Sequence, residues 1–292
     1  MITKLIPFSG PSFERCEAKE ASPFIVYPNL LPRNCGLYSP NRIVQGRKAK
    51  VFEFPWMAIL IYNNTDSPIE LFCTGALINK RYVLTSVYCV DSSKIILKVK
   101  LGEHTIGKYI DCNGEGEDRD CAPPVRDYGI ECIVRNQNYE SDTRLHNIAL
   151  IRLDRDVPFD DHIQPICLPV TKSLMMFSPE KYIVTGWGAT EHERDSKTLL
   201  KAVVIPAERS ICQKWMDQLD LKLDPSQLCV GEVNGANACN GDSGGPLGYT
   251  ALYNGMRFVQ FGIVSYASGC TLPIIYTNVA HYMPWIRANM QP

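Results

Sequence analysis

Ser243 lies in the segment of this sequence that is best suited to chemistry. It stands in the run Cys-Asn-Gly-Asp-Ser-Gly-Gly-Pro, which spans residues 239–246. Glycines on both sides of a serine allow a tight backbone turn from which the hydroxyl projects. The amides of Gly241 and Ser243 can then point at the negative charge that develops when the hydroxyl attacks a carbonyl. The segment therefore predicts a nucleophilic serine with an oxyanion hole.

The run around Ser243 resembles the nucleophile loop of chymotrypsin-like serine proteases, and other segments match that family in identity and order. They are Arg42-Ile43-Val44, Phe54-Pro55-Trp56, Cys73-Thr74-Gly75-Ala76-Leu77-Ile78, Ile148-Ala149-Leu150-Ile151, Cys167-Leu168-Pro169, Gly186-Trp187-Gly188 and Tyr276-Thr277-Asn278-Val279. The resemblance covers residues 35–290. It implies an all-β, chymotrypsin-like double six-stranded β-barrel with a C-terminal helix.

Within that family, the chain is most similar to arthropod clip-domain proteases. The similarity rests on residues 30–36 and on the insertion from Cys112 to Cys121, which is followed by Ala-Pro-Pro. A clip module needs six closely spaced cysteines, and only Cys16 precedes Cys35. We therefore expect no clip module in this chain.

Both groups that should assist Ser243 are replaced. Proton transfer from a serine hydroxyl requires an imidazole, which a carboxylate orients and charge-balances. Where the family has histidine this chain has Tyr88, and where the family has aspartate it has Asn147. A phenol, with a reference pKa of about 10, is protonated at pH 7. Loss of the carboxylate costs about 10⁴-fold in rate and loss of the base about 10⁶-fold, with overlapping effects. The resemblance therefore implies a protease fold without ordinary activity.

His146, next to Asn147, is the alternative candidate for a base. Successive residues of a strand face opposite sides, so a side chain beside the acid position should point away from Ser243. The other histidines fall in segments that the resemblance places on loops or far from the site. We expect a solvated surface position for each of them, namely His104, His162, His192 and His281.

The residues expected to form the specificity pocket also differ from the family pattern. Asn237, six residues before Ser243, stands where trypsin-like members carry an aspartate that binds Lys or Arg. Ala267 and Ile274 stand where two glycines leave room for a long side chain, although the loop before Ile274 is shorter than usual. All three changes predict poor binding of Lys or Arg.

The activation segment is retained. In the family, cleavage after the equivalent of Arg42 frees an ammonium at Ile43, which pairs with the equivalent of Asp242 and orders the oxyanion loop. A buried ion pair of this kind can act as a two-state switch. The alternative is that Arg42 is an ordinary basic residue in a linker.

The 12 cysteines are spread along the chain without a CxxC pair or zinc-finger spacing, which favours disulfides in an oxidising compartment. The resemblance implies the pairs Cys35–Cys167, Cys73–Cys89, Cys112–Cys121, Cys212–Cys229 and Cys239–Cys270, and leaves Cys16 and Cys132 open. The first residues lack a signal-peptide pattern, so we expect a secreted protein whose N-terminus is incomplete in this sequence. Asn63 begins a glycosylation acceptor pattern, Asn-Asn-Thr, which fits secretion.

The composition is that of a globular protein, with 45% hydrophobic and 21% charged residues among 292. A net charge of −1 without blocks of like sign argues against nucleic acid and anionic membranes as partners. No apolar run reaches the roughly 18 residues of a spanning helix. No cofactor and no metal are expected. The acidic loop that contains Glu115, Glu117, Asp118 and Asp120 is more typical of a solvated charged loop than of a cation site.

Short β-branched and aromatic runs between turn residues must position these side chains. We expect strands at Met57–Tyr62, Ala76–Ser86, Ile95–Leu101, Ile148–Leu153, Ile183–Gly186, Leu200–Ile205, Phe258–Ser265 and Ile275–Val279. Apolar residues at helical spacing predict helices over Ala207–Leu219 and His281–Met290. Residues 1–42 are rich in proline, which predicts an extended prosegment or linker before a protease-like domain at residues 43–292.

The sequence therefore predicts a secreted serine protease homologue without proteolytic activity. The resemblance implies a cofactor or regulator of an extracellular cascade, such as immune melanisation, whose partners are cascade proteases or their substrates. One alternative is a serine endopeptidase with residual or unconventional activity, which the retained loop around Ser243 favours. The other is a constitutive binding module or decoy that needs no cleavage at Arg42.

Overall fold

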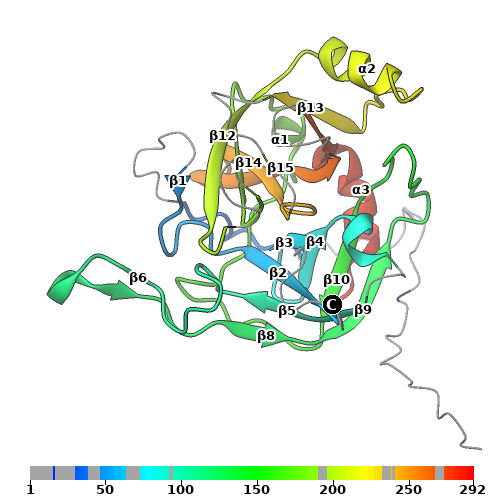
Figure 1. Cartoon of the computed structure of the whole chain (residues 1–292). Helices are drawn as coiled ribbons and strands as arrows, with labels where there is room; N and C mark the ends of the chain where they lie inside the picture. The colour runs from blue at the N-terminus through cyan, green and yellow to red at the C-terminus, as the bar shows by residue number, and fades with distance from the viewer. Residues whose placement is uncertain are drawn as a thin grey trace, which may run out of the picture.

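The computed structural model describes residue 16 and residues 30–38, 47–63, 73–91, 95–189, 196–231, 238, 241–266 and 273–292. Within these ranges the chain forms two large antiparallel sheets, each rolled into a barrel, with a few helices outside them (Figure 1). The predicted all-β, double-barrel fold with a C-terminal helix is confirmed.

The first barrel is built from strands in the order β8-β5-β2-β3-β4-β10-β9. Only Gly129 separates β8 from β9, so these two strands are the halves of one bent strand, and β9 also contacts β5. This gives a six-stranded barrel. The bounds are β2 Met57–Tyr62, β3 Cys73–Leu77, β4 Tyr82–Thr85, β5 Ile96–Leu101, β8 Arg126–Tyr128, β9 Ile130–Arg135 and β10 Ala149–Leu153.

A hairpin projects from the first barrel (Figure 1). It consists of β6 Cys112–Asn113, the 3-10 turn η2 Gly116–Asp118 and β7 Asp120–Cys121. Its four acidic residues, Glu115, Glu117, Asp118 and Asp120, are all exposed. Among the residues that the structure describes, no group of three or more His, Cys, Asp or Glu side chains could hold a metal ion.

The second barrel follows the order β1-β12-β11-β14-β15-β16-β13, and pairing of β12 with β13 closes the ring. β1 lies on the outer edge of β12, so six strands make up the closed barrel. The bounds are β1 Arg47–Lys48, β11 Tyr182–Gly186, β12 Leu200–Pro206, β13 Gln227–Gly231, β14 Pro246–Leu252, β15 Met256–Tyr266 and β16 Ile274–Asn278.

Both predicted helices are present; the first is shorter than expected, and the second begins two residues earlier and ends one residue earlier than expected. They are α2 Arg209–Asp217 and α3 Val279–Asn289. In α3, the buried side chains of Tyr282 and Ile286 lie along one stripe, as the apolar spacing predicted. The structure adds the 3-10 turn η1 Val87–Val90 and a single turn, α1 Lys172–Met175, where the Thr171 side chain accepts a hydrogen bond from the Leu174 N–H. In the described part of the chain, no helix is long and apolar enough to cross a membrane.

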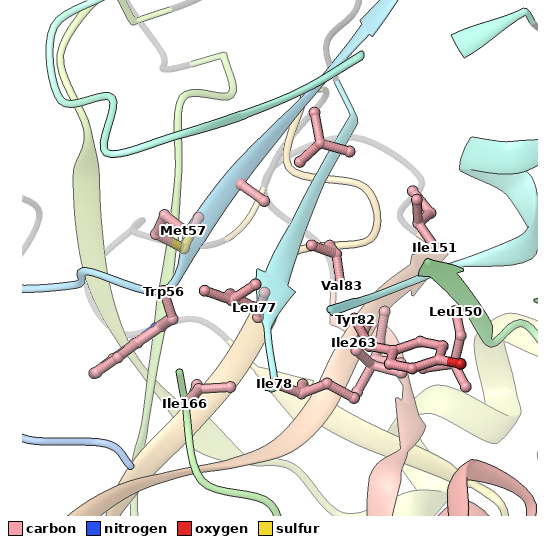
Figure 2. Close-up of a cluster of buried hydrophobic side chains, with 14 of the residues drawn as sticks. Trp56, Met57, Leu77, Ile78, Tyr82, Val83, Leu150, Ile151, Ile166 and Ile263 are labelled. Atoms are coloured by element: carbon pink, nitrogen blue, oxygen red, sulfur yellow. The ribbon is translucent and has the colours of Figure 1, made fainter. Parts of the chain in front are cut away.

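The core of the first barrel continues into the junction between the two barrels. Figure 2 shows its side chains converging from β2, β3, β4 and β10, together with Ile263 of β15 in the second barrel. Trp56 is fully buried and stacks on Phe258 with ring centroids 5.0 Å apart. Burial of each large apolar side chain contributes about 1.5–3 kcal/mol, so this shared core fixes the barrels against each other.

One predicted strand is wrong, because the run Ala76–Ser86 is two strands joined by a turn. The side-chain oxygen of Asn79 accepts hydrogen bonds from the backbone N–H groups of Arg81 (2.8 Å) and Tyr82 (2.7 Å). An asparagine that bonds its own backbone in this way reverses the chain. The reversal separates β3 from β4 and directs β4 toward η1, which carries Tyr88.

The described part of the expected prosegment, residues 30–38, contains no helix or strand but is docked on both barrels. The Gly36 N–H donates to the Pro165 carbonyl and the Phe258 N–H donates to the Gly36 carbonyl, both at 2.8 Å. The Asn79 side chain donates to the Leu30 carbonyl at 3.0 Å. Gly36 has a positive φ of 56°, and a Cβ at this position would lie 2.2 Å from the Phe258 carbonyl oxygen. This close approach requires glycine.

Candidate active site

The loop that carries Ser243 belongs to the second barrel but is attached to the first. The Thr74 N–H of β3 donates to the Ser243 carbonyl at 2.9 Å, and the Thr74 hydroxyl donates to the Asp242 carbonyl at 3.2 Å. Gly244 has a φ of 80°, and a Cβ there would lie 2.2 Å from Thr85 Oγ1. The glycine is therefore required for the loop to sit against β3 and β4. Ser243 itself is half-buried.

The two amides expected to form the oxyanion hole lie in this loop. Gly241 has a φ of 98°, a left-handed conformation that favours glycine. Within the described chain, neither the Gly241 N–H nor the Ser243 N–H donates a hydrogen bond to the fold. Neither donor is therefore used by the described residues, as the predicted oxyanion hole requires.

Asp242 points away from the surface and is 7% exposed. Its Oδ1 accepts a hydrogen bond from the Gly188 N–H at 2.9 Å. A Cβ at Gly186 would lie 1.9 Å from the same oxygen, so the carboxylate needs a glycine beside it. Its expected partner, Ile43, and the expected cleavage site at Arg42 lie outside the described residues.

The structure brings together the two replaced positions, Tyr88 and Asn147. Asn147 is fully buried, and its Oδ1 accepts the Tyr88 backbone N–H at 3.0 Å. Its Nδ2 donates to Ser265 Oγ at 2.9 Å, and its carbonyl accepts from the Thr277 hydroxyl at 3.0 Å. Both ends of the amide side chain are therefore hydrogen-bonded, as a buried polar group requires. This arrangement suits a neutral side chain.

The ring of Tyr88 is half-buried and is covered by a cation. The guanidinium of Arg144 lies 4.6 Å above the centroid of the Tyr88 ring.

Two further phenols, those of Tyr62 and Tyr139, lie near Tyr88. Burial raises the pKa of Tyr62, whose hydroxyl donates to the Cys89 carbonyl at 2.8 Å. Burial also raises the pKa of Tyr139, although Arg144 opposes that rise. Both phenols therefore stay protonated at neutral pH and neither can serve as a base.

His146 is directed to α3 rather than to Ser243. Its Nδ1 lies 3.0 Å from the Tyr282 hydroxyl, and the two rings meet edge to face. Among the described residues, no histidine is hydrogen-bonded to Ser243. His281 is exposed, as expected, and His192 lies outside the described residues.

Two histidines contradict the expected surface positions. His162 is 3% exposed and its Nδ1 lies 2.5 Å from Asp160 Oδ1. It is buried because Gly102 has no side chain, since a Cβ there would lie 2.7 Å from the His162 ring. His104 is half-buried and its Nε2 lies 2.9 Å from the Ala49 carbonyl oxygen. Neither ring therefore has the solvated surface position that was expected.

Of the three residues expected at the specificity pocket, the structure describes only Ile274. It begins β16, is fully buried and belongs to the same hydrophobic cluster as Val230, Ala238 and Val264. Its side chain therefore takes up core volume in the second barrel. Asn237 and Ala267 lie outside the described residues.

The structure contains the disulfides Cys35–Cys167, Cys73–Cys89, Cys112–Cys121 and Cys212–Cys229, which are four of the five expected pairs. Cys239 and Cys270 lie outside the described residues. The two cysteines whose pairing was open form Cys16–Cys132. Asn63 is exposed at the end of β2, and the rest of its acceptor pattern is not described.

Sequence reasoning missed Arg144, Tyr139 and Trp215. Arg144 contacts two aromatic rings that are distant from it in sequence, and Trp215 of α2 stacks on Tyr266 at 5.1 Å. No local motif marks these residues. The one available signal is position in the sequence: Arg144 lies three residues before Asn147, and Tyr266, which Trp215 contacts, directly follows Ser265.

Comparisons with known proteins agree with this geometry. The trypsin family matches residues 43–286. Serine protease grass of Drosophila melanogaster is 40% identical over 268 residues, which cover 88% of this chain and 70% of that protein. Phenoloxidase-activating factor 3 of Holotrichia diomphalia is 37% identical over 264 residues, or 88% of this chain and 75% of that protein. The crystal structure of the Drosophila Grass clip serine protease of the Toll pathway superimposes with a TM-score of 0.78 and 39% identity, over 90% of this chain and 75% of that one. This chain therefore belongs to the trypsin family.

Proposed function

We propose that this chain is a serine protease homologue without proteolytic activity, which acts as a cofactor or regulator in an extracellular proteolytic cascade. The pair formed by Tyr88 and Asn147 carries the proposal. A neutral amide occupies the acid position with both of its ends hydrogen-bonded, and a phenol occupies the base position under the guanidinium of Arg144. Ser243 then has no group that accepts its proton.

The class of pathway and partner comes from the relatives. One is named as a factor that activates phenoloxidase and another as a clip serine protease of the Toll pathway. We therefore assign this chain to an immune or melanisation-type cascade, with cascade proteases or their substrates as partners. Secretion is part of the proposal and is supported by five disulfides.

In this proposal, residues 1–42 are a prosegment and residues 43–292 are the protease-like domain. Cleavage after Arg42 releases Ile43, whose ammonium pairs with Asp242 and changes the surface that a partner recognises. Asn63 carries a glycan. Asn237 and Ala267 add to the effect of Ile274, so that an Arg or Lys side chain finds neither countercharge nor room.

Labelling of Ser243 by a fluorophosphonate probe tests inactivity, with chain that has been cleaved at Arg42. We expect labelling about 10⁴-fold or more slower than in an active relative, because the proton acceptor is absent. The Tyr88→His, Asn147→Asp variant should label faster than the unmodified chain. Its hydrolysis of arginyl peptides should stay low until Asn237→Asp, Ala267→Gly and Ile274→Gly are added.

The alternative is a serine endopeptidase with residual activity, which the retained loop geometry at Gly241 and Gly244 favours. Hydrolysis of an arginyl substrate by the unmodified, cleaved chain, abolished by Ser243→Ala, would replace the proposal with this alternative. Comparing partner binding before and after cleavage separates a switchable cofactor from a constitutive binder or decoy.

A further inference from the structure

Arg144 lies at the centre of a cluster of aromatic rings that includes Tyr88 at the base position. Its guanidinium is 4.6 Å from the centroid of Tyr88 and 6.0 Å from that of Tyr266, and its Nη1 donates to the Tyr139 hydroxyl at 2.7 Å. Tyr266 in turn stacks on Trp215 with an interplanar angle of 22°. We call these five residues, Tyr88, Tyr139, Arg144, Trp215 and Tyr266, the Arg144 ledge.

Among the described residues, no carboxylate lies within ion-pair distance of Arg144. No ion pair of Arg144 occurs among the described residues, and its other guanidinium donors make no hydrogen bond there. The two acidic residues that precede Arg144 in the same loop, Glu140 and Asp142, form hydrogen bonds with other side chains. Glu140 accepts from the Thr143 hydroxyl at 2.8 Å, and Asp142 accepts from the Ser141 hydroxyl at 3.2 Å. The ledge thus holds a fixed cation with unused donors.

The ledge is partly exposed, and two of its residues follow or precede residues that contact the candidate site. All five of its side chains are half-buried, so each presents part of its surface to solvent. Cys89, which follows Tyr88, has its Sγ 3.3 Å from the Ser243 carbonyl oxygen, and Ser265, which precedes Tyr266, is bonded to Asn147. Tyrosine, tryptophan and arginine are the side chains that contribute most to protein interfaces.

We infer that the Arg144 ledge binds a segment of a partner protein through an Asp or Glu side chain of that segment. The carboxylate pairs with the open edge of the Arg144 guanidinium, and the neighbouring residues of the segment pack on the aromatic rings. The aromatic rings hold the guanidinium in place, so less conformational entropy is lost on binding. This inference rests on the proposed function as a binding protein, and it names the chemistry of the partner.

The test begins with selection of peptides from a random heptapeptide phage library. The target is the full chain with Ser243→Ala, so that no peptide can be lost to hydrolysis. We expect Asp or Glu to be enriched at one position. The enriched peptide and a twin with Asn or Gln at that position are then labelled with fluorescein, and their affinities are measured by fluorescence anisotropy.

Affinity for the acidic peptide should fall about tenfold or more with Arg144→Gln, whereas affinity for the amide twin should not change. Arg144→Lys keeps the charge but loses the planar fork, so its loss should be intermediate. The matched control is Arg155→Gln. Arg155 also lies 4.6 Å over a tyrosine ring, that of Tyr128, but it is paired with Asp154. This control should leave both affinities unchanged.

A selection without enrichment of Asp or Glu would overturn the inference. So would an acidic peptide whose affinity survives both Arg144→Gln and Arg144→Lys, or falls equally with Arg155→Gln. The proposed function would fail in a different experiment, namely if the cleaved chain with Ser243 hydrolysed a peptide. The inference would fail if the peptide affinities did not depend on Arg144. The binding measurements use Ser243→Ala throughout.

Discussion

Replacing Asn147 with aspartate tests whether the acid position now depends on a neutral side chain. Asn147 is fully buried between the Tyr88 N–H and Ser265 Oγ. A carboxylate of the same shape keeps the first donor, and the Ser265 hydroxyl can turn to become the second. However, the new carboxylate has no imidazolium beside it to balance its charge, because residue 88 is a tyrosine. Because burial disfavours the ionised form, the pKa of the new carboxyl should rise above the value of about 3.9 in the unfolded chain.

The size of the effect follows from linkage. A rise of about two pKa units corresponds to about 2.7 kcal/mol. The folded state then holds the proton more tightly than the unfolded state, so the free energy of unfolding falls as pH rises between the two pKa values. Relative to the unmodified chain, Asn147→Asp should be nearly neutral at about pH 4 and destabilised by about 2–3 kcal/mol at pH 7.

Urea unfolding at several values of pH between 4 and 7 measures this difference. Asn138→Asp is the control, because Asn138 is exposed and its replacement should change stability little. Adding Tyr88→His to Asn147→Asp supplies the missing countercharge and should reduce the pH-dependent part of the deficit by about 1 kcal/mol, whereas the lost contact with Arg144 lowers stability at every pH. If Asn147→Asp is as stable as the unmodified chain at pH 7, or if its deficit does not depend on pH, the reasoning is refuted.

Three further predictions concern the framework around the site. After cleavage at Arg42, the N-terminal segment should stay attached until reductant is added, because Cys16–Cys132 and Cys35–Cys167 both hold it, and non-reducing peptide mapping should recover both pairs. Asp242→Asn should abolish any change in partner binding that follows cleavage, and an unchanged response would exclude the switch. Gly244→Ala should cost at least about 3 kcal/mol, since a Cβ would lie 2.2 Å from Thr85 Oγ1. Gly255→Ala, with φ 95° and its nearest atom 3.5 Å away, should cost about 1 kcal/mol, and similar melting temperatures for the two variants would contradict this reasoning.

The sequence predicted the parts of the fold that local pattern and turn chemistry decide. β2 has the predicted bounds, and the other predicted strands were found with small shifts, apart from the split run at Asn79. Strands β8, β9, β13 and β14 were not predicted, although β9 and β14 contain six and seven residues. β1, β6 and β7 contain two residues each, which is too short for a periodic signal. The burial of His162 was not predictable because it depends on the absence of a side chain at Gly102, about 60 residues earlier in the chain.

In the candidate site, too, the residues within local motifs could be predicted and those that depend on distant contacts could not. The nucleophile loop and the two replaced positions could be identified because each lies in a contiguous motif. Arg144 could not, because its role depends on rings supplied by η1, β15 and the loop at Tyr139, which only the folded chain brings together. A cation whose partners come from three segments has no local sequence signature.

Tyr88 belongs both to the base position and to the Arg144 ledge, so restoring one property should weaken the other. Tyr88→His supplies a proton acceptor for Ser243 but removes the ring that lies 4.6 Å below the guanidinium. A protonated imidazole would also repel Arg144. Loss of one cation–π contact corresponds to about 0.5–2 kcal/mol, or roughly 2- to 30-fold in affinity. The Tyr88→His, Asn147→Asp chain should therefore label faster with a fluorophosphonate while binding the acidic peptide more weakly. Tyr88→Phe keeps the ring without adding a base, so it should do neither. If Tyr88→His labels faster and keeps the full peptide affinity, the Tyr88 ring does not hold Arg144, and the loss of the base and the gain of the ledge are independent changes.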